Sequence, residues 1–449
     1  MTKRSIFILA LSDCFASSTA LAQAAQPAER APVPAEAIAP KPQVPAGKAS
    51  LVPEPGQARI ESPATKVAPL AVGEPVPPVT LAGGSRLRLS GYAQGRYEWH
   101  DGSTNGATFS STGVATPTNQ NRFLLRRAQL TTHYSGSYAE LLIQLEANTK
   151  EGLGLKDGYV SIIEPWTPLK MKLMVGQFRY PFGYEVQQMN VDLEMPERAL
   201  IEKYFFEGER DRGVRLQGGY RWLNFRVALV NGTVWDGTRN LAASKDPAPF
   251  GKDDPNEFKD WVGRVGVDFG FLVGGASGYF GKGLYLKPPV AATATTLATD
   301  PVPDSRWKYR FGADLQGYVP VPSVGVLALR GEVIWGQDTA RPFHGIPANP
   351  CNASATWGFI LSAVQRLPGN LGVVVRVDMK DTLARSFADQ CTAERTKAET
   401  DRVITTGAGL LYYASPNLRL TATYEHPTEQ SPNRRDNDFA MGQIQAMFR

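Results

Sequence analysis

From Arg86 onward the sequence repeats one pattern, in which apolar and polar side chains alternate over segments of roughly ten to fourteen residues. In the first segment, Arg86–Trp99, one parity carries only Leu, Gly, Ala, Tyr and Trp. The other parity, apart from Tyr92, carries Arg, Ser, Gln and Glu. A period of two is typical of β-strands with one apolar face. The chain is therefore expected to be all-β.

The segments are joined alternately by short turns and long polar connections. Eight long and seven short connections separate about sixteen strands. An even number of strands, with short turns at one rim and long loops at the other, is typical of a bacterial outer-membrane β-barrel. A closed barrel also satisfies every backbone hydrogen bond in lipid. Short turns are predicted at 135–137, 165–168, 221–223, 271–272, 320–323, 368–370 and 415–417, and long connections at 100–120, 149–154, 181–210, 234–260, 284–305, 337–355, 382–401 and 429–436.

Tryptophan positions favour placement of this barrel in a membrane. All eight lie near expected strand ends, six beside long loops and two at short turns, which predicts two interfacial belts. Ordinary sheet packing is the alternative explanation. The final segment, Asp438–Phe448, ends in an outward-facing aromatic residue, which resembles the assembly signal of outer-membrane barrels. Residues 86–449 are therefore predicted to be a transmembrane barrel in contact with outer-membrane lipid.

The first 80 residues have a different composition. Residues 1–24 combine Lys3 and Arg4 with an apolar stretch and small residues, which predicts a secretory signal peptide. A lipoprotein signal is disfavoured because Asp13, not a small residue, precedes Cys14. Residues 25–80 are rich in Pro and Ala and contain no aromatic residue, so they are predicted to be a disordered periplasmic tether. A spacer that touches peptidoglycan is the alternative.

The polar parity of the strands should line a pore, and most of its cations are arginine. A guanidinium stays charged and binds phosphate or carboxylate oxygens bidentately. Arg306, Lys308 and Arg310 alternate with aromatic residues and should form a column of cations along the wall. Arginine–glutamate pairs that only brace the wall are the alternative. The candidate pore-lining residues from this pattern are Arg215, Arg226, Arg306, Lys308 and Arg310.

Several segments resemble the phosphate-selective porin O and P family. Asn121–Leu130 is similar to its F-x-x-R-R-A segment, and Leu155–Val160 is similar to its L-K-D-A-Y segment. Val175–Glu185, VGQFRYPFGYE, resembles its motif G-Q-F-K-x-P-F-G-x-E. Pro196–Arg198 and Arg212–Val214 echo the segments that follow. The resemblance extends over about residues 86–449 and is strongest in 121–235.

This resemblance implies a homotrimer of sixteen-stranded barrels, each narrowed by an inward-folded third loop at about Tyr184–Arg210. It also implies that small anions such as phosphate are the solutes, with Arg126, Arg127, Asp157 and Arg179 as anion-site residues. Adjacent arginines should point to opposite faces of a strand. Either a bulge redirects Arg126, or it lies near the rim, or it serves a subunit contact.

The third loop itself is acidic. Between Gln187 and Arg212 there are seven acids and four bases, which argues against a simple cationic constriction. The sequence predicts an outer-membrane porin for passive diffusion of small solutes that prefers anions. A general or sugar-permeable porin is the main alternative, and a structural or adhesive barrel is another. No G-x-S-x-G motif accompanies the four histidines, which argues against an enzyme.

Cys351 and Cys391 lie in two long connections at the same rim, separated by two strands. In an oxidising compartment a disulfide between them is predicted, and two independent thiols are the alternative. No Cys or His cluster suggests a metal, and no cofactor is expected. The excess of 48 Lys and Arg over 43 Asp and Glu includes no long basic block, so a nucleic-acid partner is not expected.

Overall fold

The fold is described from a computed structural model. It describes the backbone of residues 77–81, 84–100, 107–109, 115–117, 121–149, 152–206, 208–232, 258–286, 303–337, 355–381, 402–429 and 437–448, and the side chains of these except 107–109, 115–117, 283–286, 303–306 and 355. The predicted signal peptide and almost all of the predicted tether lie outside these residues. Among the described residues, no helix has the length and apolar character needed to cross a bilayer.

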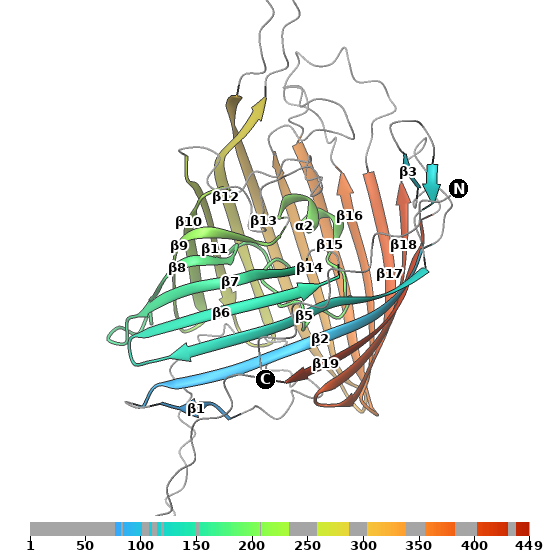
Figure 1. Ribbon diagram of the computed structural model, residues 1–449, viewed down its shortest axis with the longest axis horizontal. Helices are drawn as coiled ribbons and strands as arrows, with labels where there is room; N and C mark the ends of the chain where they lie inside the picture. Colours follow the sequence, from blue (N-terminus) through green and yellow to red (C-terminus); the bar gives the residue numbers. More distant parts are fainter. Residues whose placement is uncertain are drawn as a thin grey trace, which may run out of the picture. The chain divides into compact units, whose positions relative to one another are not determined.

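Sixteen antiparallel strands close into one barrel, in which consecutive strands of the barrel are neighbours (Figure 1). The last strand, β19, pairs with the first, β2, from His100 opposite Phe439 to Gly91 opposite Phe448. The predicted sixteen-stranded antiparallel barrel is therefore confirmed. Its strands are β2 (Arg86–His100), β5 (Asn121–Ser135), β6 (Ala139–Asn148), β7 (Gly152–Ile163), β8 (Lys172–Arg179), β9 (Arg210–Tyr220), β10 (Leu223–Val230), β11 (Asp260–Asp268), β12 (Leu272–Leu286), β13 (Pro303–Val321), β14 (Gly325–Gln337), β15 (Ala355–Leu367), β16 (Leu371–Asp381), β17 (Arg402–Ser415), β18 (Leu418–Glu429) and β19 (Phe439–Phe448).

Four short elements accompany the barrel in the described part of the chain. β1 (Val79–Thr80) pairs with the first two residues of β2. β3 (Ala107–Phe109) and β4 (Ala115–Pro117) form a separate two-stranded sheet in the connection between β2 and β5. The helix α2 (Leu200–Phe205) lies in the connection between β8 and β9. Each predicted short turn and long connection includes the junction between two consecutive barrel strands, with overlaps of up to three residues at the strand ends.

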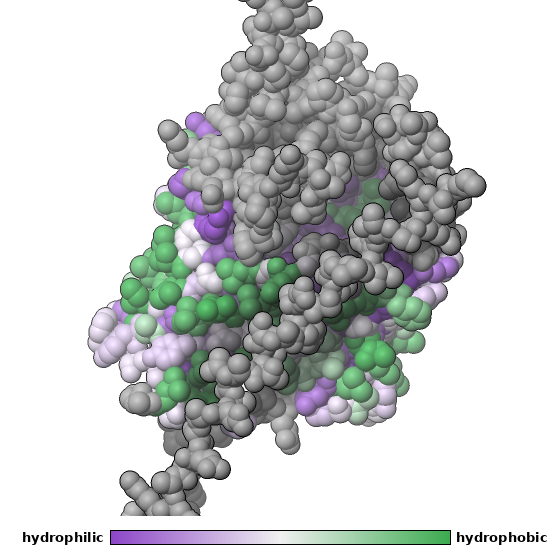
Figure 2. All heavy atoms as spheres, viewed as in Figure 1, coloured by the Kyte–Doolittle hydropathy of each residue, from purple (hydrophilic) through white to green (hydrophobic). Residues whose placement is uncertain are grey.

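The two faces of the sheet differ as the alternation predicts. In β2, Gln94, Arg96 and Glu98 are buried inside the barrel, whereas Tyr97 on the opposite parity is 39% exposed. On the face shown in Figure 2, apolar side chains form a band across the strands, with more polar side chains toward the strand ends. An apolar outer band is what a barrel needs against the hydrocarbon core of a membrane. Outward-facing tryptophans near the strand ends include Trp166, Trp222, Trp261, Trp307 and Trp335.

Candidate functional site

The connection between β8 and β9, residues 180–209, enters the barrel and is called L3. Its backbone bonds to distant strands: the carbonyl of Val191 accepts a hydrogen bond from Gln445 of β19 at 3.1 Å. The amide of Leu200 donates to Asp378 of β16 at 3.2 Å. Helix α2 lies against β15 and β16 (Figure 1). L3 therefore crosses the lumen, and the predicted inward-folded third loop is confirmed.

The first turn of L3 holds the end of the sequence motif VGQFRYPFGYE against the wall. The amides of Tyr184 and Glu185 donate to one oxygen of Glu332 on β14 at 3.1 and 2.9 Å, and the amide of Gly183 donates to Ser277 on β12 at 3.0 Å. Gly183 has φ of +53°, and a Cβ there would lie 1.8 Å from the other Glu332 oxygen. Only glycine fits this contact without strain.

An apolar core attaches the middle of L3 to one side of the barrel. The guanidinium of Arg310 on β13 lies over the rings of Phe205, Phe206 and Tyr279 at 5.3, 4.8 and 4.5 Å. Burial of each large apolar side chain stabilises such packing by about 1.5–3 kcal/mol. The buried L3 side chains of this core include Phe182, Val186, Ile201, Phe205 and Phe206, and those of the wall include Val230, Val262, Tyr279, Ile334 and Ile360.

On the other side of the lumen, one carboxylate of L3 is held by three cations. Both carboxylate oxygens of Glu197 accept hydrogen bonds from Arg126 of β5, at 2.9 and 3.2 Å. Arg96 of β2 donates to it at 2.6 Å, and Lys203 of α2 lies at 3.2 Å. Although burial by itself raises the pKa of Glu197, the neighbouring charges of Lys203 and Arg126 lower that pKa well below its usual range. Glu197 is therefore an ionised anchor at neutral pH.

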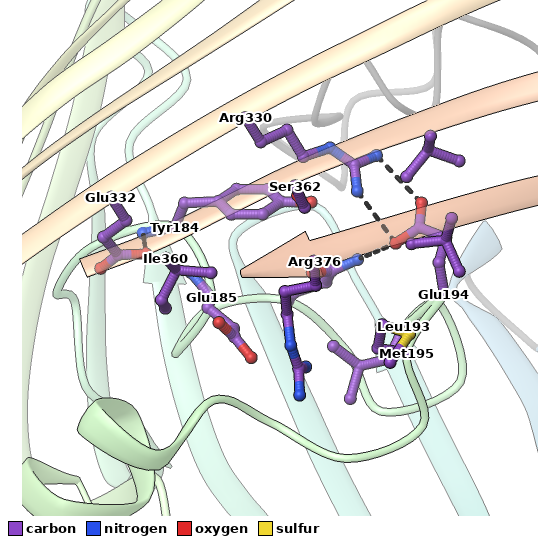
Figure 3. Close-up of a pocket in the computed structure, with 13 residues that line it drawn as sticks. Tyr184, Glu185, Leu193, Glu194, Met195, Arg330, Glu332, Ile360, Ser362 and Arg376 are labelled. Carbon is purple, nitrogen blue, oxygen red and sulfur yellow. Dashed lines mark hydrogen bonds and ion pairs between the residues drawn. The ribbon is translucent and has the colours of Figure 1, made fainter. Parts of the chain in front are cut away.

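A second carboxylate of L3 is bound at β14. Glu194 accepts two hydrogen bonds from Arg330, at 2.9 and 3.0 Å (Figure 3). Between this ion pair, Arg376 of β16 and Ser362 of β15 lies a cavity of about 40 Å³. A cavity of this size has room for a water molecule. The acidic excess of L3 is therefore partly neutralised by arginines of the wall.

The end of L3 forms a charge network that includes two of the predicted anion-site residues. Glu209 accepts from Arg179 of β8 and is paired with Arg198 at 2.6 Å. Arg210, the first residue of β9, binds Asp157 of β7 through two contacts of 2.8 and 3.2 Å. Arg179 and Asp157 are thus brought close together, and both side chains contact other parts of the chain.

A β-bulge explains how two adjacent arginines share one face of β5. Gln94 of β2 lies opposite Arg127, but the next residue, Gly95, lies opposite Leu125, so Arg126 has no partner across the ladder. One extra residue in a strand reverses the parity of everything beyond it. Arg126 and Arg127 therefore both point into the lumen. Of the three explanations that the sequence left open, the bulge is the one observed.

Four arginines inside the barrel have no ion pair with a carboxylate among the residues described. Arg226 of β10 lies opposite Arg264 of β11, whose guanidinium binds Asp314 of β13 instead. Arg215 of the neighbouring strand β9 donates to the sulfur of Met174. In this region, positive charge exceeds negative charge on the wall. The four arginines are Arg127, Arg215, Arg226 and Arg419.

The remaining predicted residues have different environments. Lys308 faces inward, as predicted, but pairs with Asp260 at 2.7 Å and is only 3% exposed. Arg310 is similarly covered by L3, so these two residues do not form an open column. The side chain of Arg306 lies outside the described part of β13, and Cys351 and Cys391 lie outside the described residues.

The parity of the strands places Arg96, Arg330 and Glu332 on the inner face of the wall, but it does not indicate that these residues hold L3. The acidic composition of the loop was the available signal, because carboxylates inside a pore require cations on the wall. The pairings themselves join residues far apart in the chain and leave no local pattern. Among the described residues, no group of three or more His, Cys, Asp or Glu side chains is placed to hold a metal ion.

No protein-family model and no curated protein matches the sequence. Solved structures do match. The outer-membrane channel DcaP of Acinetobacter baumannii has a TM-score of 0.53 at 11% identity, over 82% of this chain and 99% of that one. OmpF of Salmonella typhi, in complex with daunomycin, has a TM-score of 0.51 at 12% identity, over 83% of this chain and 100% of that one. An anion-selective porin from Comamonas acidovorans has a TM-score of 0.50 at 12% identity, over 81% of this chain and 100% of that one. The chain therefore has the fold of a bacterial outer-membrane porin.

Proposed function

We propose that this protein is a porin of the bacterial outer membrane that lets small solutes diffuse passively and prefers anions. The sixteen-stranded barrel, apolar outside and charged inside, supports the channel and its location. The signal peptide expected from residues 1–24 supports export. Similarity to solved outer-membrane channels, one of them an anion-selective porin, agrees with this proposal.

The observation that carries the anion preference is the group of inward-facing arginines without a carboxylate partner. Arg215 and Arg226 occupy neighbouring strands, and neither forms an ion pair with an acid in the described part of the chain. A fixed positive charge on a pore wall attracts anions and repels cations. Arginine remains charged at all physiological pH values, so the preference does not depend on titration.

A general porin without anion selectivity is the second candidate. It is favoured by the many wall arginines that are already neutralised, including Arg96, Arg126, Arg330 and Arg376. If these pairs dominate the potential in the pore, the remaining arginines have little influence. The two candidates therefore differ in ion selectivity, which can be measured directly.

The test uses the purified protein in planar bilayers with a gradient of potassium chloride. We expect the reversal potential to show that chloride permeates more readily than potassium, because the unpaired arginines concentrate anions in the pore. Phosphate at millimolar concentration should then reduce the chloride current. Equal permeation of both ions would favour the general porin, and a preference for potassium would contradict both anion selectivity and the role of these arginines.

Phosphate as the solute and a homotrimer as the assembly are also proposed, on the resemblance of residues 121–235 to the phosphate-selective porin family. The assembly is tested by electrophoresis of the unheated protein in mild detergent, together with its mass in solution. A species with three times the mass of the chain is expected. A monomer under all detergent conditions would contradict the proposed assembly without affecting the proposed channel.

A further inference from the structure

The three cations around Glu197 form a complete binding site for a carboxylate group. Arg126 contacts both oxygens of the group, and Arg96 adds a third hydrogen bond at 2.6 Å. The ammonium group of Lys203 lies 3.2 Å from the oxygen that Arg96 does not contact. Bidentate binding of a planar carboxylate by a guanidinium is among the strongest polar contacts in proteins. We call Arg96, Arg126 and Lys203 the carboxylate site.

Part of this site keeps its geometry whether or not Glu197 is bound. The guanidinium of Arg96 is also held by Glu98 at 3.1 Å and by the side-chain oxygen of Gln443 at 3.1 and 2.8 Å. Glu98 is in turn fixed by Arg122. A binding group that is already oriented loses less freedom when a ligand arrives. The β-bulge turns Arg126 into the lumen beside it.

The site is also open to solvent on one side. The side chains of Lys203 and Arg126 are 46% and 22% exposed, and that of Glu197 is 15% exposed. The side chain of Arg96 is completely covered and forms the floor of the site. A solute in the lumen can therefore reach the cations from the side where Lys203 lies.

We propose that the carboxylate site binds the carboxylate groups of permeating solutes, and that Glu197 is an internal competitor that occupies it when no solute is present. This inference rests on the proposed anion channel and adds the class of solute, small carboxylic acids in their ionised form. The occupant that the chain itself provides is a carboxylate, and the two contacts from Arg126 match its planar pair of oxygens.

Competition from Glu197 has a clear physical consequence. A group on the same chain acts at an effective concentration of roughly millimolar or higher. A free carboxylate must compete with it and is therefore bound weakly and released quickly. Weak binding suits a channel, because a solute that binds tightly does not leave. When the solute displaces Glu197, L3 also loses one of its attachments to β2 and β5.

The experiment measures how succinate reduces the chloride current through single channels. In Glu197→Gln the competing charge is gone and the cations remain, so half-maximal block should require roughly tenfold less succinate than in the natural protein. Glu194→Gln is the matched control, because it removes the other L3 carboxylate that is held by the wall, at Arg330. In that variant, half-maximal block should require the same succinate concentration as in the natural protein.

A double variant separates binding at the site from simple loosening of L3. In Glu197→Gln/Arg126→Gln the loop is at least as free as in the single variant, but the main bidentate donor is missing. The increased sensitivity to succinate seen in Glu197→Gln should therefore disappear. Glu197→Asp keeps the charge and the fold while shortening the side chain, and it should give a smaller gain. An unchanged block in Glu197→Gln, or a gain that persists in the double variant, would overturn the inference.

The reversal potential of the natural protein distinguishes failure of this inference from failure of the proposed function. An anion-preferring channel with no gain in Glu197→Gln would leave the proposed function intact and remove the carboxylate site. A channel without anion preference, in which Glu197→Gln still lowers the succinate concentration for half-maximal block, would contradict the proposed function and support the carboxylate site.

Discussion

Replacing Arg215 and Arg226 together with glutamate is expected to turn an anion-preferring channel into one that prefers cations. The two substitutions replace two positive charges with two negative ones, a net change of −4, on a wall where neither arginine has an ion pair with a carboxylate among the described residues. A change of about 1.4 kcal/mol in the energy of a permeating ion, modest for charges this close, alters a permeability ratio about tenfold. The measurement is the chloride-to-potassium permeability ratio from reversal potentials.

Two controls make this result specific. Arg215→Lys/Arg226→Lys keeps both charges and should retain most of the natural ratio. Arg221→Glu changes one charge in the turn between β9 and β10, over the ring of Tyr220 and away from the lumen, and should have little effect. A glutamate double variant with the natural permeability ratio would show that these arginines do not set selectivity.

Gly183→Ala is expected to release the first turn of L3 from the wall and to raise both single-channel conductance and current noise. An alanine at φ of +53° costs about 1–2 kcal/mol. Its Cβ would also meet Glu332 at 1.8 Å, which forces that carboxylate away from the two amides it accepts from. A hydrogen bond inside a protein contributes about 0.5–1.5 kcal/mol, so the loss of both adds about 1–3 kcal/mol to the backbone strain.

Gly208→Ala is the matched control for this prediction. Gly208 lies in the same loop at φ of +76°, but a Cβ there has no atom within 4 Å. The control therefore has the backbone strain without the displaced carboxylate, and its conductance should stay near the natural value. If both variants behaved alike, strain rather than the contact with Glu332 would control L3.

The architecture could be predicted from the sequence because barrels in lipid obey a simple rule. Each strand must present apolar side chains on one face, so the alternation in segments such as Arg86–Trp99 gives both the strands and their orientation. Most of the short turns could be located because they contain polar residues, Pro or Gly, and the apolar turn at 271–272 is the exception. The inward direction of Arg215, Arg226 and Lys308 followed from parity in the same way, and the structure has each of them on that face.

The site was less accessible to this reasoning, for two physical reasons. Parity fails wherever a bulge adds a residue, and nothing in the segment NRFLLRRAQL marks Arg126 as the extra one. The partners of L3 are set by how the loop crosses the lumen, which joins Glu197 to Arg96 across 101 positions of the chain. The sequence therefore showed that L3 is acidic, but the cations that neutralise it could only be found in three dimensions.

The closure of the barrel has a consequence for assembly. Among the described residues, the first and last strands of the barrel are joined by the ladder of β2 and β19, and this ladder cannot form until β19 has been synthesised. L3 contacts both strands of this ladder from inside the barrel, because Glu197 pairs with Arg96 of β2 and the carbonyl of Val191 accepts a hydrogen bond from Gln445 of β19. These contacts of L3 should therefore stabilise the pairing of β2 with β19 in the last step of folding. Under the proposed function, the same segment both narrows the pore and holds β2 to β19, so a substitution that weakens one role should also weaken the other.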